Sequence, residues 1–450
     1  MPLYLQRAEF QNVRGFRNLE LDFGTPQAPR LWTVVIGNNG HGKSSILRGI
    51  ALGLCDQKTA NALLLKVPGS FIRTNKKGFS EESARIRLTF TTSGKSAATH
   101  TLETRVIRAA DGSELIDRTR SEEETFPWTQ LFVCGYGVNR GTRGTAARSV
   151  YSLQNGLATL FDDRVDLLDP ESVLRDFKLR TFEQQAQRRK RPKERRGRAM
   201  PDSFEELRKI LWKLWDLQPM HKLEVASDKV TVHGPWGGLP FHALGDGYRG
   251  TAGWVLDLLG AYLKAGQWEP RSAVTGIVLI DEVDEHLHPS WQKRVIPQLK
   301  RLFPGLQFIA TTHSPLTIVN TAPGEVVATT LHNAVAELDT NPLPDPTGKT
   351  ANEILTDWFG VTSSLDSASE ALLRKYRSAL ARRKKSDVYA LRKKLEQRVG
   401  SFVTSPLDEL AVEIAADLRK QLSTEMPKPE RARLVHEHAT FLRKRLAESK

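Results

Sequence analysis

Two kinds of apolar run alternate along the chain, and each predicts a different element. Apolar, largely β-branched runs stand at 31–36, 276–280 and 308–310, which is typical of strands buried on both faces of a parallel sheet. Apolar residues at helical spacing follow at 46–52 and 250–264. Strands that alternate with helices predict an α/β fold around a parallel sheet.

Strict alternation of apolar and polar residues marks a second kind of strand. Residues 85–90 and 101–107 alternate in this way, so we expect an antiparallel β lobe over about 70–135 with one solvated face. The segments 3–10 and 19–23 predict a further antiparallel pair that leads into the first buried strand.

Helical patterns dominate two other regions. Residues 170–187 and 203–215 belong to a predominantly helical region at about 150–217. Residues 361–450 carry amphipathic helical patterns with a basic face. We therefore divide the chain into a head at 1–360 and a basic, helical C-terminal subdomain at 361–450.

The net charge of +14 is concentrated in two segments. A basic insertion at about 183–198 holds eight basic and two acidic residues, and residues 366–450 hold 20 basic and 12 acidic residues. The rest of the chain is close to neutral. Three interpretations remain open: the segments bind a polyanion, nucleic acid foremost, they dock a protein partner, or they are solvated surface.

Composition excludes several classes of protein. No apolar run approaches the roughly 18 residues that a membrane span requires, so we expect no membrane partner. The only cysteines, Cys55 and Cys134, are too few for a disulfide framework or a cysteine-rich zinc site. A cytoplasmic location fits best, since the first residues also predict no export signal.

A glycine-rich stretch, GNNGHGKSS at 37–45, stands between a predicted strand and a predicted helix and has the composition of a phosphate-binding loop. The glycines allow main-chain N–H groups to turn toward an anion, and the helix directs its N-terminal dipole to the same place. Lys43 would reach the β- and γ-phosphates, and the Ser44 hydroxyl would be a ligand of Mg²⁺. The expected nucleotide contacts are Gly37, Asn38, Asn39, Gly40, Gly42, Lys43, Ser44 and Ser45.

Two acids follow the buried strand at 276–280. Asp281 and Glu282 would lie at the carboxyl edge of the sheet, next to the phosphate loop of a neighbouring parallel strand. We expect Asp281 to hold Mg²⁺, directly or through water, and Glu282 to orient and polarise the water that attacks the γ-phosphate. His313 follows the third buried strand, where it would contact the γ-phosphate or that water.

A second glycine-bearing stretch, LGDGYR at 244–249, precedes the helix at 250–264. Glycines before a helix offer free N–H groups, although such a turn alone is equally typical of a simple helix cap. The acid pair that follows in the chain favours a ligand-binding role.

The chain resembles the ABC-type ATPase heads of the RecF, SMC and OLD group over about residues 1–360. The motifs that carry the resemblance are, in chain order, 37–45, 244–249, 277–282 and 311–315. Within that group the chain is most similar to the PtuA-like ATPases of Septu antiphage systems, through 132–137, 281–291 and 347–361. The resemblance implies a P-loop NTPase fold of the ABC/SMC type, with ATP and Mg²⁺ as ligands and ATP held between two heads.

The resemblance also implies roles for individual residues. The glycine-rich stretch corresponds to Walker A, the acid pair to Walker B and His313 to the switch histidine, while Asp284 falls in the D-loop. The stretch 244–248 looks like the signature motif, which in the family caps the γ-phosphate of the opposite subunit. The contacts it would supply are Gly245, Asp246, Gly247 and Tyr248.

Two positions depart from the family pattern. Gly245 stands where the family usually has Ser, so binding across the subunits would rest on main-chain N–H groups. The glutamine of the Q-loop has two candidates, Gln130 and Gln154, of which we favour Gln154.

Missing features narrow the expected function. The interval between the Q-loop and the signature lacks the sustained heptad repeats of long coiled-coil arms. The sequence also lacks the Cys-x-x-Cys motif of a zinc hook. The basic C-terminal segment lacks the acid cluster of a Toprim nuclease, so we expect no nuclease site in this chain. The resemblance instead implies a homo-oligomer joined through its nucleotide sites that regulates a separate HNH nuclease acting on nucleic acid. A RecF-like DNA-maintenance ATPase and a nucleotide-gated assembly scaffold remain as alternatives.

Overall fold

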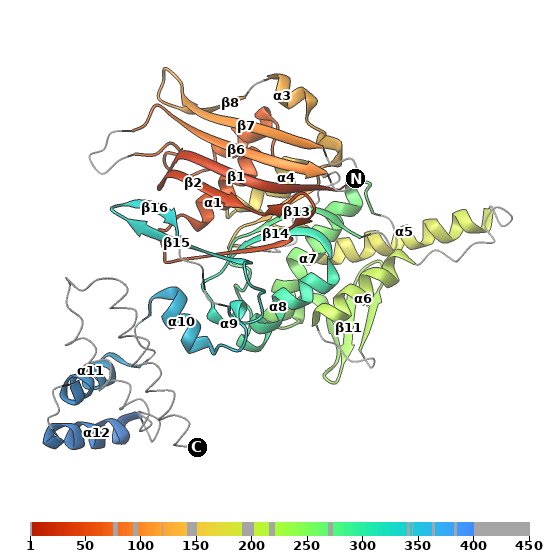
Figure 1. The fold of residues 1–450 in the computed structure, drawn as a ribbon. Helices are drawn as coiled ribbons and strands as arrows, with labels where there is room; N and C mark the ends of the chain where they lie inside the picture. Colours follow the sequence, from red (N-terminus) through yellow and green to blue (C-terminus); the bar gives the residue numbers. More distant parts are fainter. Residues whose placement is uncertain are drawn as a thin grey trace. The chain divides into compact units, whose positions relative to one another are not determined.

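A computed structural model gives the fold of the chain (Figure 1). It describes residues 2–74, 80–92, 98–118, 120–141, 151–190, 202–215, 221–268, 273–339, 343, 345–361, 365–381 and 385–399. The chain divides into two units, Met1–Gly360 and Val361–Lys450.

The larger unit is built around a six-stranded sheet with the order β16-β15-β5-β14-β13-β9. Neighbouring strands pair in parallel, except that β16 forms an antiparallel hairpin with β15. Both β5 and β14 are buried along their whole length, as expected of strands covered on both faces. The strands are β5 (Trp32–Ile36), β9 (Val133–Tyr136), β13 (Thr275–Ile280), β14 (Gly305–Thr311), β15 (Val326–His332) and β16 (Val335–Leu338).

A second sheet has five antiparallel strands in the order β2-β1-β6-β7-β8. The predicted antiparallel strands are confirmed, but the N-terminal pair belongs to the same sheet as the later ones. Strand β9, which falls inside the predicted lobe at 70–135, instead pairs in parallel with β13. The strands are β1 (Leu3–Val13), β2 (Phe16–Asp22), β6 (Ser83–Thr92), β7 (Thr99–Arg108) and β8 (Glu114–Arg118), and a two-stranded ribbon follows β2 as β3 (Gly24–Thr25) and β4 (Ala28–Pro29).

Helix α1 (Lys43–Gly53) lies between the two sheets, with contacts to β1 and β6 on one side and to β13 and β14 on the other. Alternate residues of β5 therefore enter different cores. Val35 packs in the core that contains α1 and the antiparallel sheet, whereas Val34 and Ile36 pack with α7 (Asp246–Lys264) and α8 (Pro289–Leu302). The parallel sheet is thus covered on both faces.

Helices α5 (Pro170–Lys190) and α6 (Ser203–Trp215) pack against each other and carry a small sheet of β10 (Lys222–Val225), β11 (Val230–Gly234) and β12 (Gly237–Pro240) (Figure 1). The predicted basic insertion begins in α5, but its residues 191–198 lie outside the described residues. The remaining short helices are α2 (Gln57–Leu64), α3 (Arg120–Thr125), α4 (Leu153–Leu157), α9 (Pro315–Ile318) and α10 (Ala351–Phe359), with single turns η1 (Trp128–Gln130), η2 (Ala158–Leu160) and η3 (Phe241–Ala243).

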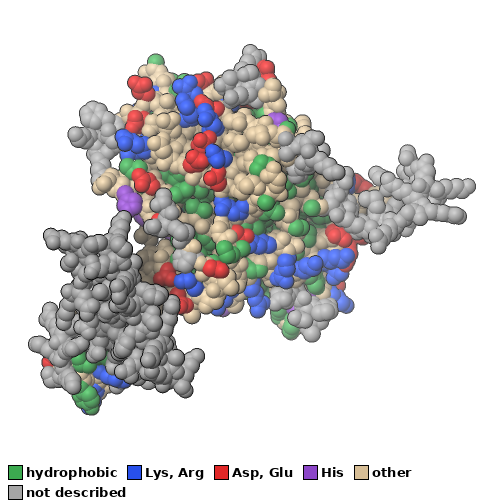
Figure 2. Space-filling model, in the orientation of Figure 1, with side chains coloured by type: hydrophobic (Ala, Val, Ile, Leu, Met, Phe, Trp, Pro, Cys, Tyr) green, Lys and Arg blue, Asp and Glu red, His purple; other side chains and the backbone are tan. Residues whose placement is uncertain are grey.

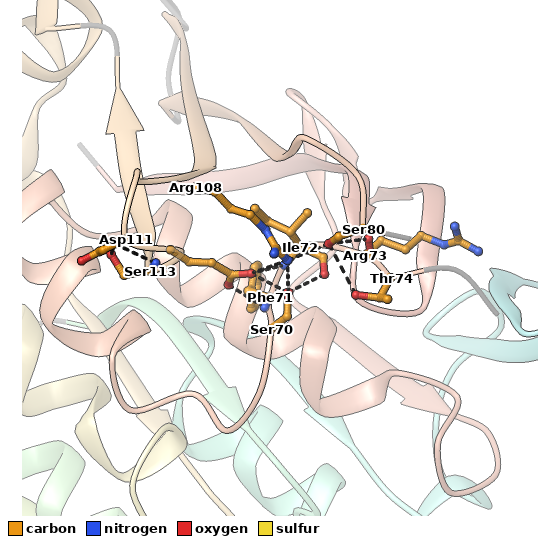
Figure 3. Close-up of polar contacts among 10 residues, drawn as sticks. Ser70, Phe71, Ile72, Arg73, Thr74, Ser80, Arg108, Asp111 and Ser113 are labelled. Carbon is orange, nitrogen blue, oxygen red and sulfur yellow. Dashed lines mark hydrogen bonds and ion pairs between the residues drawn. The ribbon is translucent and has the colours of Figure 1, made fainter. Parts of the chain in front are cut away.

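The segment after α2 is fixed to the edge of the antiparallel sheet by polar contacts (Figure 3). Glu114 accepts hydrogen bonds from the main-chain N–H groups of Phe71 at 2.7 Å and Ile72 at 3.3 Å, and Arg108 donates to the Ser80 hydroxyl at 2.6 Å. The carbonyl of Phe71 in turn accepts the N–H of Arg14, in the turn between β1 and β2. These bonds hold that turn, and Phe16, the first residue of β2 after it, packs beside the glycine-rich loop.

Charges of both signs are interspersed on the solvated face of the antiparallel sheet (Figure 2). Arg85 and Arg87 both pair with Glu103, and Arg7 pairs with Glu20. Such a balanced surface lacks the one-sign field that attracts a polyanion.

The smaller unit is described only in part. Its helices α11 (Ser367–Ala381) and α12 (Lys385–Val399) pack through the buried side chains of Tyr376 and Leu395. Asp366 precedes α11 and pairs with Arg398 at the end of α12, at 3.1 Å. Residues 400–450, which belong to the predicted basic subdomain, lie outside the described residues. Among the helices that the structure describes, none is long and apolar enough to cross a bilayer.

Candidate active site

Three neighbouring strands of the parallel sheet deliver the predicted site residues to one edge. The glycine-rich loop follows β5, residues 311–313 end and follow β14, and the acid pair follows β13. The carboxyl ends of parallel strands meet at the same edge of a sheet, which is where α/β proteins bind ligands. We expected the acid pair beside the strand of the glycine-rich loop, and this detail was wrong, because β14 lies between β5 and β13.

The glycine-rich loop requires glycine at specific positions. Gly37 and Gly42 have φ angles of 147° and 85°, which L side chains rarely adopt. A Cβ on Gly37 would stand 2.2 Å from the Thr329 hydroxyl, and one on Gly42 would stand 2.4 Å from the Phe16 ring. By contrast, a Cβ on Gly40 would meet no atom within 4 Å. The loop is therefore packed at its two ends and open at its middle.

Lys43 lies across this loop. Its Nζ donates to the carbonyl oxygens of Gly37 at 2.8 Å and Asn38 at 3.1 Å, and the residue is only 6% exposed. Burial lowers the pKa of the Lys43 ammonium, while the carboxylates of Asp281 and Glu282 act in the opposite direction. The ammonium group thus lies between the loop and the acid pair.

Helix α1 begins directly after Gly42, and no side chain caps its N-terminus. The first N–H groups of a helix have no partner within the helix, so an anion can accept them. Ser44 and Ser45 stand in this first turn, whereas Asn38 and Asn39 are exposed in the loop before it. The predicted phosphate contacts are therefore together at one place.

Strand β15 supports the loop from its other side, a contact that sequence reasoning missed. His41 places Nδ1 2.9 Å from the carbonyl oxygen of Thr329, and the Thr329 hydroxyl donates to the carbonyl of Ile36 at 2.9 Å. These bonds tie the loop, and the end of β5 from which it leaves the sheet, to β15.

Thr311 connects the two acids, and it too was missed. Its hydroxyl donates to Asp281 Oδ1 at 2.6 Å and accepts the main-chain N–H of Glu282 at 2.8 Å. Asp281 is 3% exposed, so a buried carboxylate here needs this partner. A threonine that ends a buried strand resembles an ordinary β-branched residue in the sequence, which hides this role.

Glu282 lies beside His313, with 3.8 Å between Glu282 Oε1 and His313 Nε2. Burial, together with a hydrogen bond to Glu285 and the charges of Asp281 and Asp284, raises the pKa of the Glu282 carboxyl to about 7. Burial and nearby Lys43 lower the pKa of His313 below its usual 6.5. At neutral pH the pair therefore combines a neutral imidazole with a carboxylate able to accept a proton.

Arg140 is a further residue at this site, in a role that sequence reasoning did not identify. It follows β9, and its guanidinium Nη2 donates to the main-chain carbonyl of Glu282. Burial lowers the pKa of Arg140 to about 10, against the opposing effect of the surrounding acids, Asp284 and Glu285 foremost, so it stays charged at neutral pH. An arginine in a loop carries no local signal of such a role.

Asp284 is tied to the same edge by Thr312, whose hydroxyl donates to Asp284 Oδ1. Burial raises the pKa of Asp284, and this hydrogen bond opposes the effect. The predicted D-loop residue therefore lies beside the acid pair.

The predicted signature residues form the start of α7, which begins at Asp246, earlier than the expected 250. Gly245 is the N-cap, and the Tyr248 ring packs edge-on against Trp291, with 5.1 Å between ring centroids. Trp215 donates its indole N–H to the Tyr248 carbonyl at 3.2 Å. Among the described residues, no hydrogen bond, ion pair or ring contact joins the stretch 245–248 to the glycine-rich loop.

The two candidate Q-loop glutamines are also apart from the site. Gln130 ends the turn η1 and Gln154 lies in α4, and both are exposed. Within the described part of the chain, neither has a hydrogen bond to the glycine-rich loop or to the acid pair. The assignment of Gln154 stays a prediction.

Comparisons with known proteins show what the chain is similar to. Two family models match the chain, one described as "AAA domain" at residues 7–214 and one as "AAA domain, putative AbiEii toxin, Type IV TA system" at residues 186–320. The Septu protein PtuA of Bacillus mycoides (strain KBAB4) is 26% identical over 381 residues, which is 83% of this chain and 47% of that protein. The retron Vc95 probable ATPase of Vibrio cholerae serotype O1 biovar El Tor is 40% identical over 114 residues, or 24% of this chain and 21% of that protein.

The chain thus spans about half the length of the PtuA protein that it matches. Among solved structures, an SMC head bound to the C-terminal winged-helix domain of ScpA matches with a TM-score of 0.43 and 15% identity, over 76% of this chain and 98% of that one. The predicted resemblance to PtuA-like members of the RecF, SMC and OLD group is confirmed by the sequence comparisons.

Proposed function

We propose that this chain, a PtuA-like member of the RecF, SMC and OLD group of P-loop proteins, binds and hydrolyses ATP at the edge of its parallel sheet. The observation that carries the proposal is the convergence at one edge of three groups: the Lys43 loop, the buried Asp281 and the Glu282–His313 pair. A phosphate-binding loop alone supports only binding, whereas a carboxylate with a pKa near 7 beside it supports hydrolysis.

The phosphates are bound by the glycine-rich loop and the start of α1. Main-chain N–H groups at the uncapped N-terminus of α1 donate hydrogen bonds to the phosphate oxygens, and Lys43 is the first residue of that helix. Lys43 already lies over Gly37 and Asn38, so it needs little rearrangement to contact the β- and γ-phosphates.

The residues present also fit Mg²⁺. The Ser44 hydroxyl and the carboxylate of Asp281 are oxygen ligands of the kind that Mg²⁺ accepts alongside phosphate and water. Thr311 engages Oδ1 of Asp281, which leaves Oδ2 for the ion or one of its waters. When bound, Mg²⁺ would neutralise charge on the phosphate oxygens.

Glu282 and His313 act on the water. The Glu282 carboxylate orients the attacking water and accepts its proton as the new bond to the γ-phosphorus forms and the bond to the bridging oxygen of ADP breaks. His313 is neutral at neutral pH, so it can hold the water or a γ-phosphate oxygen by a hydrogen bond.

A second copy of the chain would complete the site. Tyr248, in the signature stretch, contacts the aromatic side chains of Trp215 and Trp291, and among the described residues no hydrogen bond, ion pair or ring contact joins 245–248 to the glycine-rich loop of the same chain. Their glycines and the N-terminus of α7 are suited to the γ-phosphate bound by another copy, as the resemblance implies. ATP would then join two heads, and hydrolysis would release them.

The assembled ATPase would serve an antiviral defence system. This part of the proposal is supported by the similarity to a Septu protein and to a retron ATPase. A separate HNH nuclease as partner, and nucleic acid as the material on which that nuclease acts, follow only from the family resemblance. The ATP-joined assembly would control when the nuclease is active.

The test measures ATP hydrolysis by the purified chain, with the Lys43→Ala chain as the background. Hydrolysis above that background, together with an ATP-dependent increase in oligomer mass, supports the proposal. The same rate in both chains would contradict it. Co-purification with an HNH protein encoded beside the gene then tests the partner separately.

A further inference from the structure

We propose that Arg140 and Thr311 are positioning residues that clamp the main chain of Glu282 from both sides, so that its carboxylate faces the attacking water. The inference rests on the proposed ATPase function and names two residues on which the rate of hydrolysis depends. We call this pair of contacts the Glu282 clamp.

The clamp holds both main-chain polar atoms of Glu282. Its N–H donates to the Thr311 hydroxyl at 2.8 Å, and its carbonyl accepts a hydrogen bond from the Arg140 guanidinium. Thr311 ends β14 and Arg140 follows β9, the two strands that flank β13 in the sheet. Glu282 is therefore fixed by side chains from both of its neighbouring strands.

The backbone conformation explains why Glu282 needs such support. Its φ angle is 49°, in the left-handed region that side chains other than glycine rarely adopt. Residues stay in this region when the surrounding structure over-determines them, and they gather at functional sites. The two hydrogen bonds of the clamp hold Glu282 in this conformation, and the resulting turn directs its carboxylate toward His313.

The positive charge of Arg140 has a second effect on Glu282. Four carboxylates surround its guanidinium, those of Asp281, Glu282, Asp284 and Glu285. Like charges this close repel one another, so a cation among them lets the acids share one edge of the sheet. A neutral side chain could replace the hydrogen bond to the carbonyl but not this effect.

The clamp predicts a specific kinetic defect. Among the described residues, neither clamp residue makes a hydrogen bond to the glycine-rich loop or to Lys43, so nucleotide affinity should survive loss of the Arg140 contact. Thr311 also donates to Asp281, the expected Mg²⁺ ligand, so its loss should weaken nucleotide affinity as well. Water positioning depends on where Glu282 points, so the catalytic step should slow. If the two residues had a merely structural role, their loss would instead lower the melting temperature, the nucleotide affinity and the rate together.

The experiment uses the full chain with Arg140→Gln, Arg140→Lys, Thr311→Val and Thr311→Ser. We expect Arg140→Gln and Thr311→Val to lower kcat by about tenfold or more, and Arg140→Gln to leave KM and the Kd of an ATP analogue within about threefold. Arg140→Lys keeps the charge and Thr311→Ser keeps the hydroxyl, so each should recover most of the loss. These two variants also test the proposal if the larger changes impair folding.

Matched controls come from β7, in the other sheet. Arg105→Gln removes an exposed arginine, and Thr104→Val removes a buried hydroxyl that has no hydrogen-bond partner among the described residues. Neither change should alter kcat.

A double-mutant cycle shows whether the clamp acts through Glu282. In a Glu282→Gln background, Arg140→Gln should change the residual rate by less than about twofold. Equal losses in both backgrounds would overturn the clamp, as would variants that keep the wild-type kcat. If the wild-type chain hydrolyses no more ATP than Lys43→Ala, the proposed function fails and the clamp fails with it. Hydrolysis by the wild type with unaffected variants overturns the clamp alone.

Discussion

The side chain of Gln307, on β14, binds the main chain of Leu5, on β1, as a strand would. Its Oε1 accepts the N–H of Leu5 at 2.8 Å and its Nε2 donates to the Leu5 carbonyl at 2.8 Å. Leu5 stands where the register of β1 against β6 shifts, between Leu5 and Arg7. Gln307 is fully buried, so one amide joins the two sheets on either side of α1.

We predict that Gln307→Leu strongly destabilises the head. The change leaves two buried main-chain groups of Leu5 unpaired, each at a cost of about 1–3 kcal/mol. The midpoint of thermal unfolding should fall by several degrees. Gln11→Leu, at an exposed position of β1, is the matched control and should unfold near the wild-type temperature. Equal midpoints for both variants would mean that Gln307 does not join the sheets.

Lys43→Ala should abolish ATP binding at micromolar concentrations. The ammonium lies across the phosphate loop, and hydrogen bonds to charged groups contribute about 1.5–3 kcal/mol, so the Kd should rise by about 10–100-fold. Isothermal titration with ATP and Mg²⁺ measures the change. The melting temperature without nucleotide should change little, which separates lost binding from lost folding. An unchanged Kd would remove Lys43 from the binding site.

Glu282→Gln should keep ATP but hydrolyse it very slowly. The amide preserves the shape of the carboxylate but cannot accept the proton of the attacking water, and loss of a general base costs about 10²–10⁴ in rate. The rate of single-turnover hydrolysis should therefore fall, whereas the Kd of ATP should stay constant. Undiminished turnover by Glu282→Gln would show that another residue activates the attacking water.

Strand type and the strand–loop–helix order could be predicted from the sequence because both depend on local patterns. The continuous apolar run at 276–280 predicts a doubly buried strand, and β13 is buried from Gly276 to Ile280. Helix α6 was predicted at its observed bounds, Ser203–Trp215, since its amphipathic spacing is regular. Residues that directly follow such a strand can then be placed at its carboxyl end from their position in the chain.

Strand order and the clamp residues could not be predicted in the same way. The position of β14 between β5 and β13 depends on pairing between distant segments, which no local pattern records. Thr311 resembles a β-branched strand residue, and Arg140 resembles any loop arginine. Their roles arise only when strand ends meet, so they become visible only in the fold.

A composite site predicts complementation between two inactive chains. Gly247→Asp places a carboxylate in the signature stretch, where a Cβ meets no atom of its own chain within 4 Å. We expect it to fold normally but to repel the γ-phosphate bound by another copy. Mixed with Lys43→Ala chains, it should restore about a quarter of wild-type hydrolysis, because half of random dimers carry one intact site of two.

Gly247→Ala is the control for this mixture, since it adds no charge, and it should be nearly as active as the wild type. Hydrolysis should be measured after the two inactive chains are unfolded together and refolded, or co-expressed, so that mixed dimers form. No recovery in verified mixed dimers would show that each chain uses its own signature residues or none.

The basic insertion predicts a nucleic-acid contact that a salt titration can detect. Residues 183–198 hold eight basic residues, of which Arg188, Arg189 and Lys190 end α5. Each phosphate neutralised by a protein releases about 0.9 counterions, so replacing the basic residues at 188–198 with Gln should lower DNA or RNA affinity and flatten its dependence on salt. A variant with Arg7, Arg17, Arg85 and Arg105 changed to Gln, on the balanced face of the antiparallel sheet, should keep the wild-type slope. If the wild type and both variants show the same slope of affinity against salt, the insertion is solvated surface or contacts a protein partner.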